Sequence, residues 1–543
     1  MSQDQKEKII KRISLLLIVY SFIVSFSYVH KSYPQITTTD EGFGSKIRPS
    51  AAGIYIDHRQ FNQDVLHYTI KISLNTTEQQ IAGDVSLNMK FIDLPSGVIL
   101  LNLYDNLTID SLLVDGKTAE FMLKGRRLAV TLPTEYSPAD TFTVRVLYHG
   151  KPKNLGYSSF KFGEINGNQL VGTLSEPEFA STWFPCNDRP DDKAFLDMYI
   201  KNDSSFTSVS NGILAEVISD SSYKIYHWQT LYPISTYLIC LYSSKYEVIK
   251  DQCILASGDT LPIYYYVIPK HLQNAKKDFK DHADMINFFS GLFGEYAFIK
   301  EKYGVAEFLW QGGAMENQTI TGIGTMFVRG NEQLTEILAH ELSHHWWGDC
   351  VGPKAWKDIW LNEGFATYSE MLYASHYDTT MSVGSRMRAY RGLSYDEAVY
   401  DPKVDMFSGS VYYKGAWILH MVRGELGDST FFAVLRNWFE TYKYSNASTE
   451  DFKALSEKLS GKDLTQFFDQ WLYHGTGKIA AEFTWKTEKS SDGVLLTLKV
   501  KQTQSGYKAY HFPLDVFFEM ARETGHLRRK YILSRLSRLF NSH

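Results

Sequence analysis

The segment that most constrains this chain is Ile337–Asp349, which contains the pattern H-E-x-x-H. On an α-helix, His340 and His344 are four residues apart, so both imidazoles project from one face. That spacing lets two nitrogens reach one Zn²⁺ at about 2.0–2.1 Å each. Glu341 lies beside them and is the candidate general base for hydrolysis. The segment therefore predicts a buried helix that carries two ligands of a zinc site.

A catalytic zinc ion needs a third protein ligand, and Glu363 is the candidate. It lies in the segment Trp360–Ala366, and eighteen residues separate it from His344, enough to finish one helix, turn and begin another. Two histidines and one glutamate leave the fourth zinc position open to water, as hydrolysis requires. The sequence therefore predicts one Zn²⁺ per chain, held by His340, His344 and Glu363.

Length and composition exclude several classes of protein. A chain of 543 residues is too long for one hydrophobic core and indicates three or four domains. A net charge of −5 offers no basis for nucleic-acid binding. The four cysteines show no C-x-x-C spacing and so no metal cluster. Cys240 and Cys253 are expected either to pair across a hairpin in an oxidising compartment or to be free buried thiols.

The N-terminal segment, residues 1–29, has the pattern of a membrane-targeting sequence. Lys6, Lys8, Lys11 and Arg12 precede an apolar run of 17 residues, 13–29. This order predicts a cytoplasmic N-terminus and translocation of the rest of the chain. An uncleaved signal anchor, a cleaved signal peptide and a buried core helix all stay open. The anchor places the catalytic domain outside the cytoplasm, periplasmic or extracellular and bound to the membrane; a cleaved signal makes it secreted or periplasmic.

The rest of the chain divides by hydrophobic periodicity. Residues 30–54 are polar and predict a linker. Short alternating runs over 55–255 predict an N-terminal β-sandwich domain. Helical periodicity dominates 256–476 after one strand-like run, which predicts a small sheet with a helical body. Alternation returns in 477–543, which predicts a small β-sandwich and a basic tail. The expected fold class is multidomain α+β.

Four further segments extend the pattern beyond the zinc ligands: Trp183–Pro190, Pro233–Leu238, Gly313–Asn317 and Val411–Ala416. Together with the zinc ligands they resemble the M1 family of metallopeptidases, the gluzincin aminopeptidases. The resemblance runs in order from about residue 55 to 520. It implies a saddle-like N-terminal β domain, a thermolysin-like catalytic domain and a small β-sandwich, without the large helical C-terminal domain of many members. In chain order, the four segments are similar to the family's F-P-C-x-D-x-P turn, P-x-S-T-Y-L strand, G-x-M-E-N box and Y-x-K-G segment.

The resemblance implies a zinc-dependent aminopeptidase that acts on peptides with a free N-terminus. Glu316 is expected to bind the α-ammonium group, since a carboxylate in that position admits only free amino ends. Glu176 is expected to supply a second contact to the amine, or else to be a surface loop carboxylate. Gly313 and Ala314 would lie along the substrate backbone. Tyr412 would donate a hydrogen bond to the oxyanion.

Several positions and alternatives stay open at this point. Leu174 stands where many members have Gln, which leaves the preferred first residue of the substrate undetermined. His345 faces about 100° away from His344, so we predict no zinc contact for it. Asp349 and Glu370 are either partners of the zinc ligands or structural ion pairs. The alternatives to an aminopeptidase are an M1-like epoxide hydrolase and an inactive peptide-binding relative.

Overall fold

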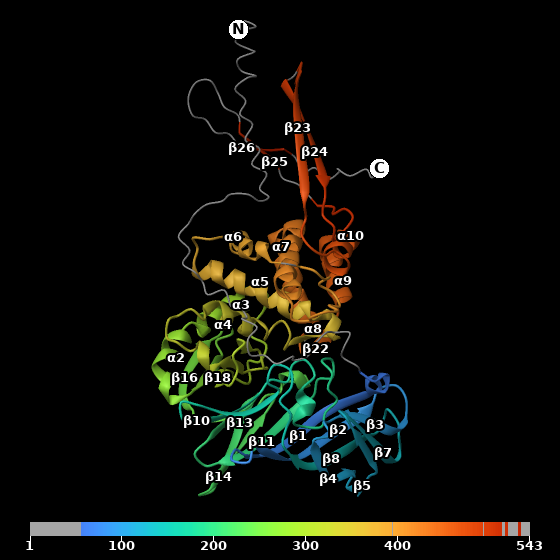
Figure 1. The fold of residues 1–543 in the computed structure, drawn as a ribbon, viewed down its shortest axis with the longest axis vertical. Helices are drawn as coiled ribbons and strands as arrows, with labels where there is room; N and C mark the ends of the chain where they lie inside the picture. Colours follow the sequence, from blue (N-terminus) through green and yellow to red (C-terminus); the bar gives the residue numbers. More distant parts are fainter. Residues whose placement is uncertain (1–55, 394, 492, 513–515, 520–529, 534–543) are drawn as a thin grey trace. The chain divides into compact units, whose positions relative to one another are not determined.

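The computed structural model describes residues 56–393, 395–491, 493–512, 516–519 and 530–533 (Figure 1). The predicted signal segment 1–29 and linker 30–54 lie outside the described residues. No helix among the described residues is both long enough and apolar enough to cross a bilayer. The described residues after Lys478 form a unit apart from those before it.

The N-terminal region is built from three β-sheets, and its strands show the expected alternation of buried and exposed residues. Val65, Tyr68, Ile70 and Ile72 of the first strand are all buried. The eight-stranded sheet has the order β13-β14-β11-β1-β2-β8-β4-β5, in which only β1 and β11 are parallel neighbours. The strand bounds are β1 Gln63–Asn75, β2 Gln80–Phe91, β4 Leu107–Val114, β5 Lys117–Thr118, β8 Thr141–Gly150, β11 Phe195–Asp203, β13 Ile213–Ser219 and β14 Tyr223–Gln229.

Two smaller sheets complete this region. The three-stranded sheet contains β3 Ser96–Asn102, β7 Arg127–Tyr136 and β6 Phe121–Lys124. The four-stranded sheet contains β12 Thr207–Val209, β15 Tyr242–Ser244, β10 Asn168–Thr173 and β9 Phe160–Ile165. The second of these leads directly into the residues around Glu176.

A five-stranded sheet and a group of helices form the catalytic region. The order β16-β17-β18-β20-β19 makes β19 an edge strand, and β17, β18 and β20 run parallel. The strands are β16 Glu247–Ile254, β17 Thr260–Val267, β18 Tyr303–Phe308, β19 Ala314–Met315 and β20 Thr321–Gly324. A short parallel pair, β21 Val351–Pro353 and β22 Ser445–Ala447, follows the predicted zinc helix.

The helices pack closely around the predicted zinc site. α4 packs on α5, and α5 packs on α7, as Figure 1 shows for the yellow to orange part of the chain. The α-helices are α2 Leu272–Asp278, α3 His282–Phe293, α4 Thr335–Ser343, α5 Trp360–Tyr377, α6 Val383–Met387, α7 Gly415–Leu426, α8 Asp428–Tyr442, α9 Thr449–Ser460 and α10 Thr465–Phe468. Two π-helical turns are η9 Ser410–Lys414 and η10 Asp469–Tyr473. The short 3₁₀ turns are η2 His58–Asn62, η3 Ala180–Thr182, η4 Thr236–Leu238, η5 Pro269–His271, η6 Thr325–Phe327, η7 Trp356–Asp358 and η8 Arg388–Gly392.

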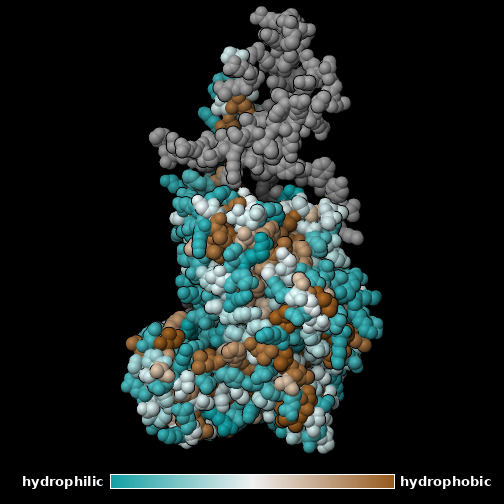
Figure 2. Space-filling model, turned by 180° about the vertical axis from the view of Figure 1, so that it is seen from behind, coloured by the Kyte–Doolittle hydropathy of each residue, from teal (hydrophilic) through white to brown (hydrophobic). Residues whose placement is uncertain are grey.

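The core is rich in aromatic side chains, and the surface is mixed. Trp346, Trp347 and Trp360 are fully buried next to the predicted zinc ligands. On the face shown in Figure 2, apolar patches lie between hydrophilic residues. All four cysteines are free and buried. The hairpin expected to join Cys240 and Cys253 does not form, because Cys253 lies opposite Leu261 in the β16–β17 ladder and Cys240 precedes β15.

The described C-terminal residues form two antiparallel strand pairs. β23 Ala481–Ser490 pairs with β24 Gly493–Gln502, and β25 Val516–Glu519 pairs with β26 Lys530–Leu533. Their strand content agrees with the predicted return to β structure. The small β-sandwich itself stays a prediction.

Candidate active site

The two histidines of the H-E-x-x-H pattern lie at the end of α4 and face one glutamate of α5. His340 is in the last turn, and His344 follows the helix with φ −58° and ψ −24°, so its backbone is still helical. The Nε2 atoms of His340 and His344 each lie 3.4 Å from Oε2 of Glu363. Both imidazoles therefore converge on the same carboxylate oxygen.

The other ring nitrogen of each histidine has a partner that orients it. Nδ1 of His340 lies 3.3 Å from Oε2 of Glu370. Nδ1 of His344 donates to the carbonyl oxygen of Trp347 at 3.0 Å. With Nδ1 engaged in both rings, Nε2 is the nitrogen left for a metal ion, and the outer partners hold the rings in place.

These donors fit a zinc ion. One atom from each of His340, His344 and Glu363 lies within 4.8 Å of the other two. Oε2 of Glu363 is buried and makes no hydrogen bond among the described residues. Two imidazole nitrogens and one carboxylate oxygen are the donor set of catalytic zinc sites that keep an open position. The predicted ligands are thus together and correctly oriented.

Electrostatics couple the three donors. Burial favours the uncharged carboxyl form of Glu363, but the adjacent His344 and His340 lower its pKa to about 2. Burial opposes a charge on His340, but the adjacent carboxylates of Glu363 and Glu370 raise its pKa well above 6.5. The strong attraction between these groups keeps Glu363 ionised, as a metal-binding carboxylate must be.

Glu341 lies on α4 next to the histidines and faces the same buried space. Its side-chain oxygen belongs to a group with Glu316 and His344 in which the donor atoms lie within 4.8 Å of one another. Burial raises the pKa of Glu341 to about 8. A carboxylate with a raised pKa beside the metal donors is placed to accept and return a proton.

Glu316 and Glu176 meet beside Glu363, although they come from different regions of the chain. Glu316 follows β19, and Glu176 follows β10 in the N-terminal region. One oxygen from each of the three carboxylates lies within 4.8 Å of the others. Both Glu176 and Glu316 are about 95% buried, at 6% and 4% exposure, which excludes the surface-loop alternative for Glu176.

Neither of these two glutamates is fully satisfied by the protein. Oε1 of Glu176 and Oε1 of Glu316 are buried and make no hydrogen bond among the described residues. Burial raises the pKa of both carboxyls, and the negative charge of Glu316 raises that of Glu176 further. Buried carboxylates need a partner, so the two unpartnered oxygens leave room for a cationic group.

Tyr412 reaches the metal donors from the π-helical turn η9. Its ring lies 6.0 Å from that of His340, nearly parallel to it. Burial, followed by the negative charge of Glu363, raises the pKa of Tyr412 well above 10, so the phenol keeps its proton. Tyr413 points elsewhere, because its ring stacks on Tyr390 at 4.3 Å.

The approach of Tyr412 depends on two glycines. A Cβ atom on Gly364 of α5 would lie 3.0 Å from Cα of Gly415, the first residue of α7. The two backbones are therefore in direct contact. This contact brings η9 next to Glu363, which explains the glycine in the Y-x-K-G segment.

Gly313 and Ala314 lie along the edge of the five-stranded sheet. Ala314 pairs with Ile323 of β20, and the carbonyl of Gly313 accepts a hydrogen bond from Gly324. Gly313 has φ +145°, a backbone conformation that favours glycine. The other edge of β19 is available for an extended peptide, which can add to a sheet edge through backbone hydrogen bonds.

Asp349 and His345 form a separate buried pair. Nδ1 of His345 lies 2.7 Å from the Tyr296 hydroxyl, and its Nε2 lies 3.6 Å from Oδ2 of Asp349. His345 thus points away from the metal donors, as predicted. Of the two residues proposed as partners of the zinc ligands, Glu370 contacts His340, and Asp349 faces His345 instead.

Three groups that contact the site residues or their neighbours were not predicted from the sequence. The carbonyl of Trp347 orients His344, the Tyr390 hydroxyl lies 3.5 Å from Oε1 of Glu370, and Tyr237 donates to the carbonyl of Gly348 at 3.2 Å. A backbone carbonyl carries no sequence signal. Tyr390 is one of 35 tyrosines and no local pattern marks it, whereas Tyr237 lies in the P-x-S-T-Y-L segment, which gave no hint of its contact with Gly348.

Two family models match the chain in order. The Peptidase M1 N-terminal domain matches residues 64–238, and the Peptidase family M1 domain matches residues 278–471. Together they cover more than half of the chain. The chain belongs to the M1 family of peptidases.

Relatives of this M1 peptidase are similar over part of their length. Probable aminopeptidase 2 of Sulfurisphaera tokodaii is 28% identical over 390 residues, which cover 67% of this chain and 48% of that protein. Glutamyl aminopeptidase of Homo sapiens is 28% identical over 328 residues, which cover 56% of this chain and 34% of that protein. The chain therefore spans about half of the length of the first relative and about a third of the length of the second.

Solved structures show the same fold. The M1 zinc metallopeptidase from Deinococcus radiodurans aligns with a TM-score of 0.66 and 24% identity, over 76% of this chain and 93% of that chain. Legionella pneumophila aminopeptidase A in complex with aspartic acid aligns with a TM-score of 0.74 and 19% identity, over 90% of this chain and 57% of that chain. The predicted α+β fold and the zinc cofactor of this M1 peptidase are confirmed.

Proposed function

We propose that this M1 peptidase is a zinc-dependent aminopeptidase that removes single residues from the free N-terminus of peptides. The observation that carries the proposal is the pair of buried carboxylates, Glu176 and Glu316, each with an oxygen that has no partner among the described residues. They lie beside Glu363, one of the metal donors. A peptide ammonium group bound there holds its first peptide bond next to the metal, and the relatives named as aminopeptidases support this reading.

Each residue of the site has its own role in the proposed reaction. Zinc, when bound, supplies Lewis-acid polarisation and lowers the pKa of water. Glu341 takes the proton from the attacking water and returns it to the leaving amine. Tyr412 donates a hydrogen bond from its phenol, which stays protonated, to the oxygen that develops negative charge. β19 aligns the substrate backbone, while Glu316 and Glu176 hold its ammonium group.

The experiment that tests the proposal compares free and N-acetylated peptides. We expect cleavage of a panel of amino-acyl fluorogenic amides and short peptides, with release of one N-terminal residue per turn. N-acetylation removes the positive charge and should abolish cleavage. Equal cleavage of the acetylated peptides would contradict the role of Glu316, and zinc-loaded protein that cleaves no member of the panel would contradict the activity itself.

The Glu341→Gln variant separates metal binding from catalysis. Glutamine keeps the shape of Glu341 but cannot accept the proton. We therefore expect normal zinc content and a fall in kcat of about 10²–10⁴-fold. Elemental analysis and amide hydrolysis provide the two measurements. Near-normal turnover in this variant would show that another group is the base.

We further propose that the catalytic domain works outside the cytoplasm, tethered by residues 13–29 or released after their cleavage. The basic residues before the apolar run support this orientation. Cell fractionation with an antibody against the catalytic domain, followed by protease treatment of intact cells, tests it. Protection from protease both in intact cells and in spheroplasts, with degradation only after lysis, would contradict the proposal.

A further inference from the structure

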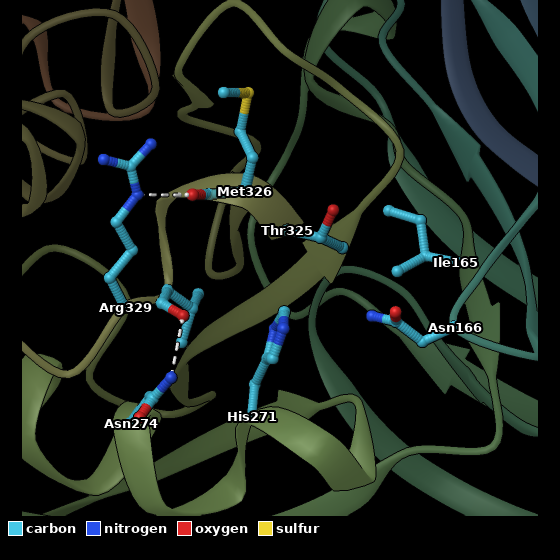
Figure 3. Close-up of a pocket in the computed structure, with 8 residues that line it drawn as sticks. Ile165, Asn166, His271, Asn274, Thr325, Met326 and Arg329 are labelled. Carbon is cyan, nitrogen blue, oxygen red and sulfur yellow. Dashed lines mark hydrogen bonds between the residues drawn. The ribbon is translucent and has the colours of Figure 1, made fainter.

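A pocket of about 470 Å³ lies outside the metal site, at the carboxyl ends of parallel strands β17, β18 and β20 (Figure 3). Its walls come from the β9–β10 turn, from the start of α2 and from the segment that follows β20. The carboxyl ends of parallel strands are a common location of ligand sites, because the loops there diverge.

One wall carries a histidine in a fixed orientation. Nδ1 of His271 lies 2.7 Å from Oε2 of Glu307, which is fully buried in β18. Oε1 of Glu307 accepts a second hydrogen bond, from the backbone of Ile268 at 3.1 Å. A buried carboxylate that holds one ring nitrogen presents the other, Nε2, to the pocket. Figure 3 shows His271, Thr325 and Asn166 around the same space.

The opposite wall carries an arginine with free donors. Nε of Arg329 donates to the carbonyl of Met326 at 3.0 Å, and within the described residues its two terminal nitrogens make no hydrogen bond or ion pair. The backbone of Arg329 is held separately, by Oδ2 of Asp278 at 3.0 Å. The guanidinium group is thus positioned beside the pocket and open to a ligand.

The pocket offers donors and positive charge but no free carboxylate. None of its lining residues is acidic. The two nearby acids are already used, Glu307 by His271 and Ile268, and Asp278 by three backbone N–H groups. Arginine, histidine, asparagine and threonine together match a carboxylate, which accepts several hydrogen bonds at once.

The pocket also lies at the end of the sheet toward which a bound peptide would run. Glu316 follows β19 at the end that would receive the ammonium group, and Gly313 precedes β19 at the other end. Gly313 accepts a hydrogen bond from Gly324, and Thr325 of the pocket follows immediately. A peptide that extends along β19 away from Glu316 therefore runs toward the end of the sheet at which the pocket opens.

We propose that this pocket binds the C-terminal carboxylate of the peptide substrate, so that the enzyme prefers short peptides with both ends free. The inference rests on the proposed aminopeptidase activity and deepens it by naming the substrate class. Arg329 is the charged contact, and His271, Asn166 and Thr325 are the polar side chains around it. Because an extended peptide advances ~3.3 Å per residue, a fixed carboxylate site favours a narrow range of lengths.

The test compares matched peptides that differ only at the C-terminus. Peptides with a leucine first residue and one to five following glycines are prepared as free acids and as C-terminal amides, and kcat/KM is measured for each. We expect the acid to exceed the amide by about tenfold at the preferred length, the value of one charge-assisted contact, and the ratio to fall for longer peptides. A leucine anilide, which has no C-terminal carboxylate, reports the aminopeptidase activity by itself.

The Arg329→Gln variant assigns the effect to the pocket. Its side chain is exposed, so the substitution should leave the fold intact, as thermal unfolding will verify. We expect the ratio of acid to amide to approach one in this variant. The control is Arg436→Gln, another exposed arginine, on α8, and it should keep the wild-type ratio.

Two results would overturn the inference. One is a ratio near one in the wild-type enzyme, and the other is a wild-type preference that Arg329→Gln leaves unchanged. Cleavage of the leucine anilide in either case would show that the aminopeptidase proposal still stands. Failure to cleave the anilide would instead contradict the proposed function.

Discussion

Four glutamates in one buried site differ because their neighbours differ. Glu363 faces two histidines, which lower its pKa to about 2, while burial raises the pKa of Glu341 to about 8. Glu176 and Glu316 face each other, and burial raises the pKa of both. The same side chain can thus serve as metal ligand, base and ammonium-binding group in a single active site.

The role of Tyr412 can be tested by removing its hydroxyl group. In Tyr412→Phe the ring stays beside His340 but the donor to the developing oxyanion is lost. We expect kcat to fall about 10²–10³-fold, with a much smaller change in KM. Steady-state kinetics on one amino-acyl amide provide the measurement. Tyr413→Phe is the control, since Tyr413 stacks on Tyr390, and an equal loss in both variants would argue against a specific role for Tyr412.

The contact between Glu370 and His340 predicts an effect on metal affinity. Glu370→Gln removes the negative charge that faces Nδ1 of His340 at 3.3 Å. We expect zinc affinity to fall about 10–100-fold, measured by competition with a chelator. Glu440 is an exposed residue of α8, so Glu440→Gln should bind zinc like the wild type. If the two variants bound zinc equally well, the Glu370 contact would be without effect on the metal.

At the scale of elements, the contact between α5 and α7 sets the active-site geometry. α5 carries Glu363 and Glu370, and the turn before α7 carries Tyr412. Gly364 and Gly415 let the two backbones touch, so the ligand and the tyrosine share one small space. The first turn of α5 is therefore constrained on both sides, by α4 and by α7.

Adding one methyl group to this contact should separate the elements. In Gly364→Ala the new Cβ lies 3.0 Å from the backbone of Gly415, where no flexible side chain can yield. We expect a loss of about 1–3 kcal/mol in the free energy of unfolding and a lower kcat, because Tyr412 moves away from Glu363. Urea denaturation and kinetics measure the two effects.

A matched glycine on α7 provides the control. A Cβ on Gly424 would meet no atom within 4 Å. Gly424→Ala should therefore stabilise the helix by about 0.5–1 kcal/mol and leave kcat unchanged. Stabilisation by both substitutions would mean that the α5–α7 contact is looser than the structure indicates.

At the scale of the whole molecule, the site needs more than one region of the chain. Glu176 comes from the N-terminal sheets, whereas the zinc ligands come from α4 and α5. Lys193 joins these regions, because its Nζ donates to the carbonyls of Asp349 and Cys350 at 2.6 and 2.9 Å. Glu176 and Glu316 therefore meet only when these two regions are packed together.

The buried histidine of α3 predicts how global stability depends on pH. His282 is fully buried and donates through Nδ1 to the carbonyl of Phe279, and burial lowers its pKa to about 4. An unfolded histidine titrates near pH 6.5. Above that pH both states are neutral; below it only the unfolded chain takes up the proton, so the native state loses stability as the pH falls from 6.5 to 4.

This loss amounts to about 3 kcal/mol at pH 4 for one such group. Urea unfolding at pH 7.5, 6.0 and 5.0 measures it, with His282→Phe as the comparison. Phenylalanine fits the aromatic surroundings of Tyr265 and Tyr303 and cannot titrate. We expect a shallower fall in stability with pH in the variant, and identical slopes would show that His282 does not contribute.

Features that depend on local spacing were predictable from the sequence. The helical period places His340 and His344 on one face, and strand alternation marks the β domain without knowledge of its partners. The need for a third zinc ligand supplied Glu363, the family resemblance supplied Glu316, Glu176 and Tyr412, and the structure brings all four to the same buried space.

Other features depend on contacts between residues far apart in the chain, which no local pattern contains. Only the tertiary structure separates the roles of Glu370 and Asp349, leaves Cys240 and Cys253 unpaired, and assembles the donor-rich pocket around Arg329. The sequence determines which side chains are present and the period at which hydrophobic residues recur. Which atoms meet is decided by the packing of sheets and helices, because burial and proximity set both the partners and the charge of each group.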